Sequence, residues 1–177
     1  RFPKHNSIRN LLKKIDFPLA IPSANIAGKI SPVSPGDVID EFGKKISFIL
    51  DGGRSQVGLE STVVNLFGKT KILRPGAITK KHLKEVLRER LTTFKGSKKI
   101  RSPGLLKKHY SPGIPIKLNS KKGNNKVAFI TFGKKYKNGK NIFNLSSKGN
   151  LNEAGKNLYK ILRKIKNSQF KSNKSYS

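Results

Sequence analysis

The chain contains no cysteine, no methionine and no tryptophan, and only nine of its 177 residues are acidic. The absence of cysteine excludes a disulfide framework and metal sites built on thiolates, and it is typical of a cytoplasmic protein. The sequence has no apolar run long enough to cross a bilayer, so we expect no membrane partner. The chain also opens on Arg1 without an initiator methionine, which indicates a fragment or a processed form.

Acidic residues are scarce against 39 lysines and arginines, which gives a formal net charge of +30. Such a charge attracts polyanions, of which RNA and an acidic nucleotide are the obvious candidates. The alternative is a solvated lysine-rich surface without a partner, because the lysines are scattered among asparagines and isoleucines. The rare arginines Arg1, Arg54 and Arg74 are more informative, since a guanidinium offers a planar fork to phosphate or carboxylate that lysine does not.

Apolar residues are concentrated before residue 92, whereas the later part is rich in Lys, Asn, Ser and Gly. We therefore expect one unit over residues 1–92, a linker over 93–125 and a second, smaller unit over 126–177. Strands alternate with helices in the pattern, which predicts an α/β or α+β fold. The expected strands cover residues 18–21, 46–50, 60–66, 72–74 and 127–132.

Four helices are expected from their start signals and apolar spacing. Ser7 would cap the first helix, Ser34 the second with Pro35 and Asp37 behind it, Thr79 the third, and Asn150 with Glu153 the fourth. Gly43 would end the second helix. The expected inward faces comprise Ile8, Leu11, Leu12 and Ile15; Val38 and Phe42; Leu83, Val86 and Leu87; and Leu151, Ala154, Leu158, Ile161, Leu162 and Ile165.

A turn after residues 18–21 carries the most suggestive chemistry. Pro22 ends the expected strand because it has no N–H to donate, and Ser23 and Asn25 then offer a hydroxyl and an amide. The small residues around them, Gly28 among them, let a backbone approach a ligand closely. This pattern fits a phosphate-binding turn, and an ordinary turn of Ser, Asn and Gly is equally compatible with it.

Several other kinds of site are excluded or disfavoured. His5, His82 and His109 have no partners at ligand spacing, so we assign no metal ligand. The segment 68–70 ends like a phosphate-binding P-loop but lacks the upstream glycine, and Asp51 belongs to a tight Asp-Gly-Gly turn. No activated nucleophile or acid/base pair stands out, so we assign no catalytic residue.

Six segments follow one another in a distinctive order: R-x-P-x-H from residue 1, P-S-A-N-x-x-G-x-x-S-P from 22, D-G-G from 51, E-S-T-V-V from 60, I-L-R-P-G from 72, and S-P-G with K-K-H-Y-S-P over 102–112. Together they resemble the two-domain threonylcarbamoyl-AMP synthase family over most of residues 1–165. That resemblance implies a YrdC-like twisted mixed sheet with helices, then a linker and a small Rossmann-like α/β domain. Residues 1–92 would be the C-terminal half of the catalytic domain, 93–125 a lid over the active site, and 126–177 part of the second domain.

The resemblance implies a nucleotidyltransferase that joins L-threonine, bicarbonate and ATP, with Mg²⁺, into threonylcarbamoyl-AMP and pyrophosphate. The product would pass to a downstream tRNA threonylcarbamoyl transferase for tRNA modification, and binding of tRNA or double-stranded RNA belongs to the same expectation. Catalysis would rest on alignment and on donors aimed at the developing phosphate charge, which suits a sequence without an evident nucleophile.

Site residues are implied by the resemblance position by position. Ser23, Asn25, the backbone at Val33, Arg74 and Tyr110 would bind ATP, with Tyr110 on the linker that closes over the nucleotide. L-threonine would be bound by Arg1, which would pair with its carboxylate, and by Ser61. Considered without the family, Ser61 is also compatible with a plain strand residue, Arg74 with a surface base and Tyr110 with a packing anchor.

The chain departs from the family pattern in several places. Ala27, Val33 and Asn65 stand where the family has a hydroxyl residue, Thr and Asp, so side-chain contacts at these positions are not expected. The family's opening half is missing before Arg1 and the second domain is short. We therefore expect this polypeptide alone to be inactive.

Two alternatives remain open at this point. A carbamoyltransferase of hydrogenase maturation has a related fold, and carbamoyl phosphate as co-substrate would distinguish it. An RNA-binding module driven by charge would bind RNA with a steep salt dependence that survives loss of Ser23 and Asn25. Few aromatic residues lie among the lysines for base stacking, which disfavours the second alternative.

Overall fold

The computed structural model describes residues 3–88, 91–93, 111–121, 123, 126–168 and 170. Its elements confirm a mixed α/β fold. They are α1 (Asn6–Leu12), α2 (Pro35–Phe42), the 3₁₀ turn η1 (Gly43–Lys45), β1 (Val63–Asn65), β2 (Lys71–Arg74), α3 (Lys80–Leu87), β3 (Thr92–Thr93), β4 (Phe129–Thr131), β5 (Ile142–Asn144) and α4 (Leu151–Lys166).

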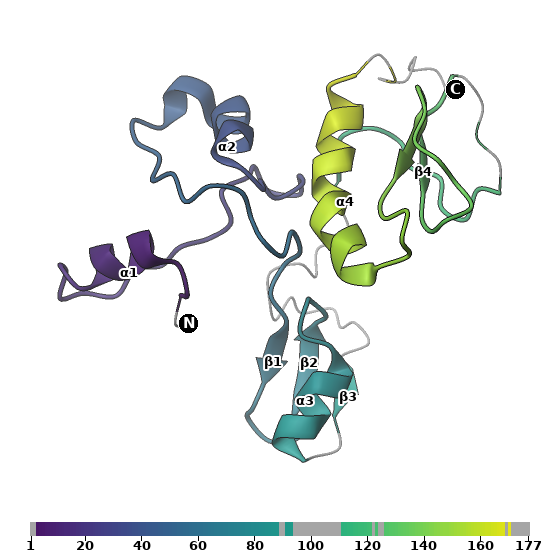
Figure 1. Ribbon diagram of the computed structural model, residues 1–177. Helices are drawn as coiled ribbons and strands as arrows, with labels where there is room; N and C mark the ends of the chain where they lie inside the picture. The colour runs from purple at the N-terminus through teal and green to yellow at the C-terminus, as the bar shows by residue number, and fades with distance from the viewer. Residues whose placement is uncertain are drawn as a thin grey trace.

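Two small sheets organise the described residues (Figure 1). The first has the order β1-β2-β3, with β1 antiparallel to β2 and β2 parallel to β3. The second is a parallel pair, β4 and β5. Asn144 stabilises the connection between β4 and β5, because its side-chain amide donates to the carbonyls of Gly133 at 2.9 Å and Tyr136 at 2.5 Å.

Helix starts follow the sequence closely, because a cap depends on residues a few positions apart. Ser34 and Thr79 form the capping boxes of α2 and α3, and α2 ends at Gly43 as expected. Asn150 caps α4, but the Glu153 carboxylate accepts a hydrogen bond from the Ser146 hydroxyl at 2.5 Å. The expected cap of the first helix is wrong: His5 caps α1 through its ring nitrogen.

The expected strands were less accurate than the helices. Residues 18–21 and 46–50 form no strand, and Ile21 and Phe48 are 62% and 80% exposed. A strand needs a partner ladder, and no described strand runs beside either segment. The strand expected over 60–66 is limited to β1. No expected strand corresponds to β5 or to the short β3, which lies across the boundary expected at residue 92.

The expected inward faces are confirmed in part. Leu83 and Leu87 of α3 are half-buried, but Val86 is 79% exposed. In α4, Ala154, Leu162 and Ile165 are buried, whereas Leu151 in the first turn is exposed. The proposed boundaries at 92 and 125 stay a prediction.

Helix α4 packs against the β4–β5 pair and against the segment that leads into α2. In Figure 1 it stands between the β4–β5 pair and the segment that leads into α2. The buried cluster contains Ile30 and Val33 from that segment and Tyr159 and Leu162 from α4, and Ile130 of β4 packs against it. This buried apolar cluster is therefore shared between residues far apart in sequence.

A close backbone approach marks the same contact. A Cβ at Gly58 would lie 2.6 Å from the Cα of Lys156, and a Cβ at Gly155 would lie 2.8 Å from Leu59. Only glycine allows the 58–59 segment and α4 to come this close. Among the described residues, no helix is long and apolar enough to span a membrane.

Candidate functional site

The turn that follows Pro22 is shaped by Asn25. Its side-chain amide donates to the carbonyls of Ile26 at 2.9 Å and Lys29 at 3.2 Å, and its backbone N–H donates to the Ser23 carbonyl at 2.9 Å. Gly28 has a φ of +80°, which a residue with a Cβ rarely adopts. We call residues 23–31 the polar loop; its conformation depends on Asn25 and Gly28.

The end of the polar loop connects to two distant strand ends. The buried hydroxyl of Ser31 lies 3.5 Å from the Asn25 side-chain oxygen and donates a short hydrogen bond to the Glu60 carboxylate. The other oxygen of Glu60 faces the Arg74 guanidinium at 3.7 Å. A continuous chain of polar contacts therefore links the polar loop to the entry of β1 and the end of β2.

The Arg74 guanidinium makes three hydrogen bonds to Ser61. Its Nε and Nη2 donate to the Ser61 carbonyl at 3.0 and 2.8 Å, and Nη2 also lies 3.1 Å from the Ser61 hydroxyl. Arg74 is only 7% exposed, whereas Ser61 is exposed, so these contacts are partly buried. A planar fork can bind one carbonyl through two nitrogens, which lysine does not do.

Gly76 brings the two strand ends together. A Cβ at this position would lie 2.4 Å from the Glu60 carbonyl oxygen and 2.4 Å from the Thr62 nitrogen. The turn after β2 thus rests directly on the backbone that carries Glu60 and Ser61, and no side chain fits between them.

Of the expected site residues, the structure links Asn25, Arg74 and Ser61 through one chain of polar contacts. Ser23 is exposed, and its hydroxyl makes no hydrogen bond within the described part of the chain. The backbone of Val33 is already paired: its N–H donates to Asp37 at 2.8 Å, and its carbonyl accepts from Ser55 at 2.8 Å. The ligand contacts assigned to these residues stay predictions.

Arg1 and Tyr110 lie outside the described residues. The residue after Tyr110 is described, and its position bears on the expected lid. The N–H of Ser111 donates to the Gly28 carbonyl at 2.9 Å, and Ser111 pairs with Lys29 in an isolated parallel bridge. The linker is therefore attached to the polar loop at this point.

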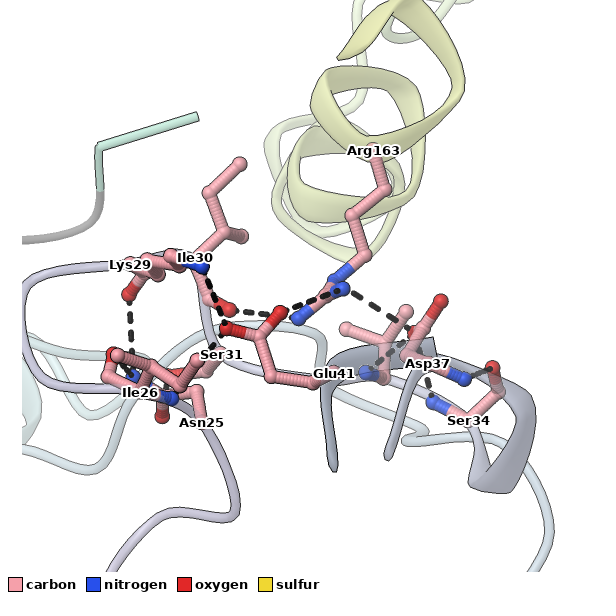
Figure 2. A network of polar contacts seen from close by, with 10 residues as sticks. Asn25, Ile26, Lys29, Ile30, Ser31, Ser34, Asp37, Glu41 and Arg163 are labelled. Carbon is pink, nitrogen blue, oxygen red and sulfur yellow. Dashed lines mark hydrogen bonds and ion pairs between the residues drawn. The ribbon is translucent and has the colours of Figure 1, made fainter. Parts of the chain in front are cut away.

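A carboxylate of α2 also contacts the polar loop. Glu41 accepts a hydrogen bond from the Ile26 N–H at 3.3 Å and pairs with Lys29 at 3.6 Å. Figure 2 shows this carboxylate between the polar loop and Arg163, which reaches in from α4. A small hollow lies here, lined by Lys29, Ile30, Glu41, Ser111, Pro112, Arg163 and Lys166.

Sequence reasoning missed Ser31, Glu60 and Arg163. Ser31 and Glu60 both stand inside segments that had been singled out, Ser31 in P-S-A-N-x-x-G-x-x-S-P and Glu60 in E-S-T-V-V, but neither was assigned a role. Arg163 is one of only eight arginines in a chain with 31 lysines, and that scarcity could have drawn attention to it. Nothing local in the sequence shows that it meets α2.

The site offers hydrogen-bond donors rather than reactive groups. Hydroxyl, amide and guanidinium groups of Ser23, Asn25, Ser61 and Arg74 suit a ligand with anionic oxygens. The described residues contain no cluster of three His, Asp or Glu side chains able to hold a metal ion. The arrangement can bind and align a charged ligand.

Comparisons with known proteins identify the family of this chain. Residues 1–76 match the family model described as "Telomere recombination", and residues 78–173 match "Threonylcarbamoyl-AMP synthase, C-terminal domain". These two matches define a class of protein in which a YrdC-type α/β unit is followed by a C-terminal domain. The chain belongs to the threonylcarbamoyl-AMP synthase family.

Individual relatives support the assignment. Threonylcarbamoyl-AMP synthase of Pyrococcus abyssi is 40% identical over 90 residues, covering 50% of this chain and 26% of the relative. The enzyme of Bacillus subtilis is 38% identical over 88 residues (49% of this chain, 25% of the relative), and that of Schizosaccharomyces pombe is 46% identical over 80 residues (45% and 20%). Each match thus covers between 20% and 26% of the relative's own length.

A solved structure matches nearly the whole chain. The crystal structure of P. abyssi Sua5 complexed with L-threonine has a TM-score of 0.77 and 25% sequence identity, and the match covers 97% of this chain and 56% of that chain. The chain therefore spans about half the length of this structural relative.

Proposed function

We propose that this chain contributes an ATP- and L-threonine-binding part of a threonylcarbamoyl-AMP synthase. The reaction joins L-threonine, bicarbonate and ATP into threonylcarbamoyl-AMP and releases pyrophosphate. The observation that carries the proposal is the contact chain from Asn25 through Ser31 and Glu60 to Arg74 and Ser61. It joins residues assigned to ATP with a residue assigned to L-threonine, as a condensation between the two ligands requires.

Each residue has a definite role in this proposal. The free hydroxyl of Ser23 and the loop shaped by Asn25 bind the nucleotide phosphates. Arg74 holds Ser61 in place and presents positive charge near the developing charge on the α-phosphate. Ser61 and Arg1 bind L-threonine, and Tyr110 closes over the nucleotide from the linker.

We propose that Mg²⁺ enters with ATP, bound by its phosphates and by water. The donor set supports this arrangement, because the described residues form no carboxylate or histidine cluster that would bind the ion independently. Mg²⁺ is commonly held through substrate phosphates in this way. When bound, it would neutralise phosphate charge and help pyrophosphate to leave.

The wider setting follows from the chemistry of the product. An acyl adenylate is an activated intermediate, so we propose transfer of its threonylcarbamoyl group to tRNA by a downstream transferase. RNA contact and a cytoplasmic location belong to the same proposal. The absence of cysteine and the net charge of +30 are compatible with both.

The proposal is tested by calorimetric titration of this chain with Mg·ATP and with L-threonine. We expect saturable binding of each ligand, and about a tenfold weaker affinity for Mg·ATP in Ser23→Ala and in Asn25→Ala. Ser23→Ala removes about one hydrogen bond to a charged group. Asn25→Ala removes the amide bonds to the Ile26 and Lys29 carbonyls that shape the loop. Ser47→Ala, at an exposed serine outside the site, is the matched control and should bind ATP normally.

Two results would contradict the proposal. One is the absence of binding of either ligand by a folded chain. The other is RNA binding with a steep salt dependence that is unchanged in Ser23→Ala and Asn25→Ala, together with no effect of these changes on nucleotides. That second result would favour a charge-driven RNA-binding module.

A further inference from the structure

Arg163 is a buried arginine on α4 whose contacts all lie on a different part of the chain. Its Nη2 donates to the Ile30 carbonyl at 2.7 Å, its Nη1 faces Glu41 at 3.7 Å, and its Nε faces Asp37 at 3.8 Å. Figure 2 shows the side chain extending from α4 into the space between these groups. The residue is 8% exposed, so it is a structural contact of the interior rather than a surface charge.

Both acids that face Arg163 also bind backbone amides of the neighbouring segment. Glu41 accepts from the N–H of Ile26 and pairs with Lys29. Asp37 accepts from the N–H groups of Val33 at 2.8 Å and Ser34 at 3.0 Å. Through these two acids, Arg163 is linked to Ile26 in the polar loop and to Val33 just after it. Arg163 also contacts Ile30 of the loop directly.

Arg163 compensates the negative charge of two largely buried carboxylates. The Glu41 side chain is 4% exposed and that of Asp37 is 17% exposed, so both carboxylates are largely removed from water. A buried carboxylate without a cation is strongly disfavoured. Lys29 reaches Glu41 but is 45% exposed, whereas Arg163 lies between both acids. The guanidinium thus offsets the negative charge of both acids and holds them in place as acceptors for the backbone.

The surrounding apolar contacts bring Arg163 to this position. Ile30 and Val33 pack with Tyr159 and Leu162 of α4, and Tyr159 precedes Arg163 by one helical turn. Burial of these side chains presses α4 against the polar loop, and the ionic contacts fix how the two meet. The Nε of Arg163 has no hydrogen-bond partner, so the fit is set by the Nη2 hydrogen bond to Ile30, the two ion pairs and apolar packing.

We propose that Arg163 is a positioning residue that holds the polar loop, residues 23–31, in its ligand-binding conformation from the second domain. Docking of α4 and ligand binding at the loop are then coupled, because whatever stabilises one stabilises the other. The role of Arg163 in holding the loop rests on the structure alone, whereas its effect on ligand binding rests on the proposed function.

The loop statement is tested without any ligand, by hydrogen exchange followed by NMR on the intact chain. In Arg163→Met, which keeps the length of the side chain but removes its charge, we expect the amides of Ile26 and Val33 to exchange at least about tenfold faster. Protection in the β1–β2 pair should stay unchanged. Lys160→Met removes a charge from an exposed position of the same helix and is the matched control.

Conservative variants separate positioning from general stability. Arg163→Lys should restore protection only in part, because an ammonium group does not reach two acids and a carbonyl together. Glu41→Gln keeps an acceptor for the Ile26 amide and removes one charge of the pair, and it should mimic Arg163→Met at Ile26 if Arg163 acts through Glu41. It also provides the test if Arg163→Met fails to fold. Unchanged loop protection in either folded variant would overturn the proposal.

The ligand statement has its own measurement. We expect the dissociation constant for Mg·ATP to rise about tenfold in Arg163→Met and to stay unchanged in Lys160→Met. Parental affinity in Arg163→Met despite a freed loop would overturn the coupling. If the unaltered chain does not bind ATP while Arg163→Met still frees the loop, the proposed function fails and the positioning role stands.

Discussion

Arg74 shows at the scale of a single residue how a side chain with an expected ligand role also organises its site. Its guanidinium binds the carbonyl and the hydroxyl of Ser61 and faces Glu60. A ligand anion at this site would therefore meet a cation already oriented by the protein, which lowers the cost of binding. The same contacts connect β1 to β2 beyond their ladder.

Gly76 is the residue that permits this arrangement, and it gives a direct prediction. Gly76→Ala should destabilise the chain by roughly 1–3 kcal/mol or more, because the added Cβ would overlap backbone atoms of residues 60–62 that have little room to move. It should also weaken L-threonine binding, since Ser61 would shift. Chemical denaturation and calorimetry measure the two effects.

Gly36→Ala is the matched control for this change. In α2 the nearest atom to a new Cβ is the Ser34 hydroxyl at 3.9 Å, and the backbone is helical. Alanine there should be neutral or stabilising by about 0.4–1 kcal/mol. Equal behaviour of the two variants would show that the contact of Gly76 with residues 60–62 is not tight in solution.

At the scale of an element, α2 serves the site through both of its ends. Its N-terminal capping box places Asp37, which binds the amide of Val33. Its last turn carries Glu41, which binds the amide of Ile26. One short helix therefore supports the polar loop at Ile26 and the segment just after the loop at Val33. The local stability of α2 should be transmitted to the loop.

The two capping boxes provide a paired test of that idea. Ser34→Ala in α2 and Thr79→Ala in α3 should each cost about 1 kcal/mol of unfolding free energy, because each removes an acceptor for an otherwise unpaired amide. Only Ser34→Ala should speed hydrogen exchange at Val33 and weaken Mg·ATP binding. A comparable effect of Thr79→Ala on Val33 would contradict the role given to α2.

At the scale of the whole molecule, α4 is the element that joins the two units. Its apolar face shares a core with Ile30 and Val33, and its backbone touches the 58–59 segment. The polar loop, the entry to β1 and α4 thus meet in one region. No residue of α4 is assigned to a ligand, but we expect substitutions on α4 to affect the candidate site.

Gly58→Ala tests this contact. Gly58 has a φ of +74°, and an added Cβ would lie 2.6 Å from the Lys156 Cα. Gly53→Ala is its control, because Gly53 has a φ of +73° and no atom within 4 Å of a new Cβ. Gly53→Ala should cost about 1–2 kcal/mol from backbone strain alone. Gly58→Ala should cost roughly 1–3 kcal/mol more, because it also forces α4 away.

Denaturation curves give both values, and hydrogen exchange at Ile26 shows whether the polar loop responds. We expect faster exchange at Ile26 in Gly58→Ala and no change in Gly53→Ala. Equal unfolding free energies for the two variants would mean that α4 does not press on the 58–59 segment in solution.

The sequence by itself determined the features that depend on neighbouring residues. The caps at Ser34, Thr79 and Asn150 and the end of α2 at Gly43 follow from short-range hydrogen bonds and backbone preferences. The resemblance carried by ordered segments also indicated the family. None of these inferences required knowing which distant residues meet.

Only the tertiary structure decided which segments become strands and which charges are buried. Residues 46–50 have the composition of a strand but no described partner ladder, whereas the weakly marked residues 142–144 pair with β4. In the same way, Arg163 resembles any basic residue of a helix until Ile30, Asp37 and Glu41 are seen around it. Pairing and burial are set by contacts between distant parts of the chain, and local patterns do not encode them.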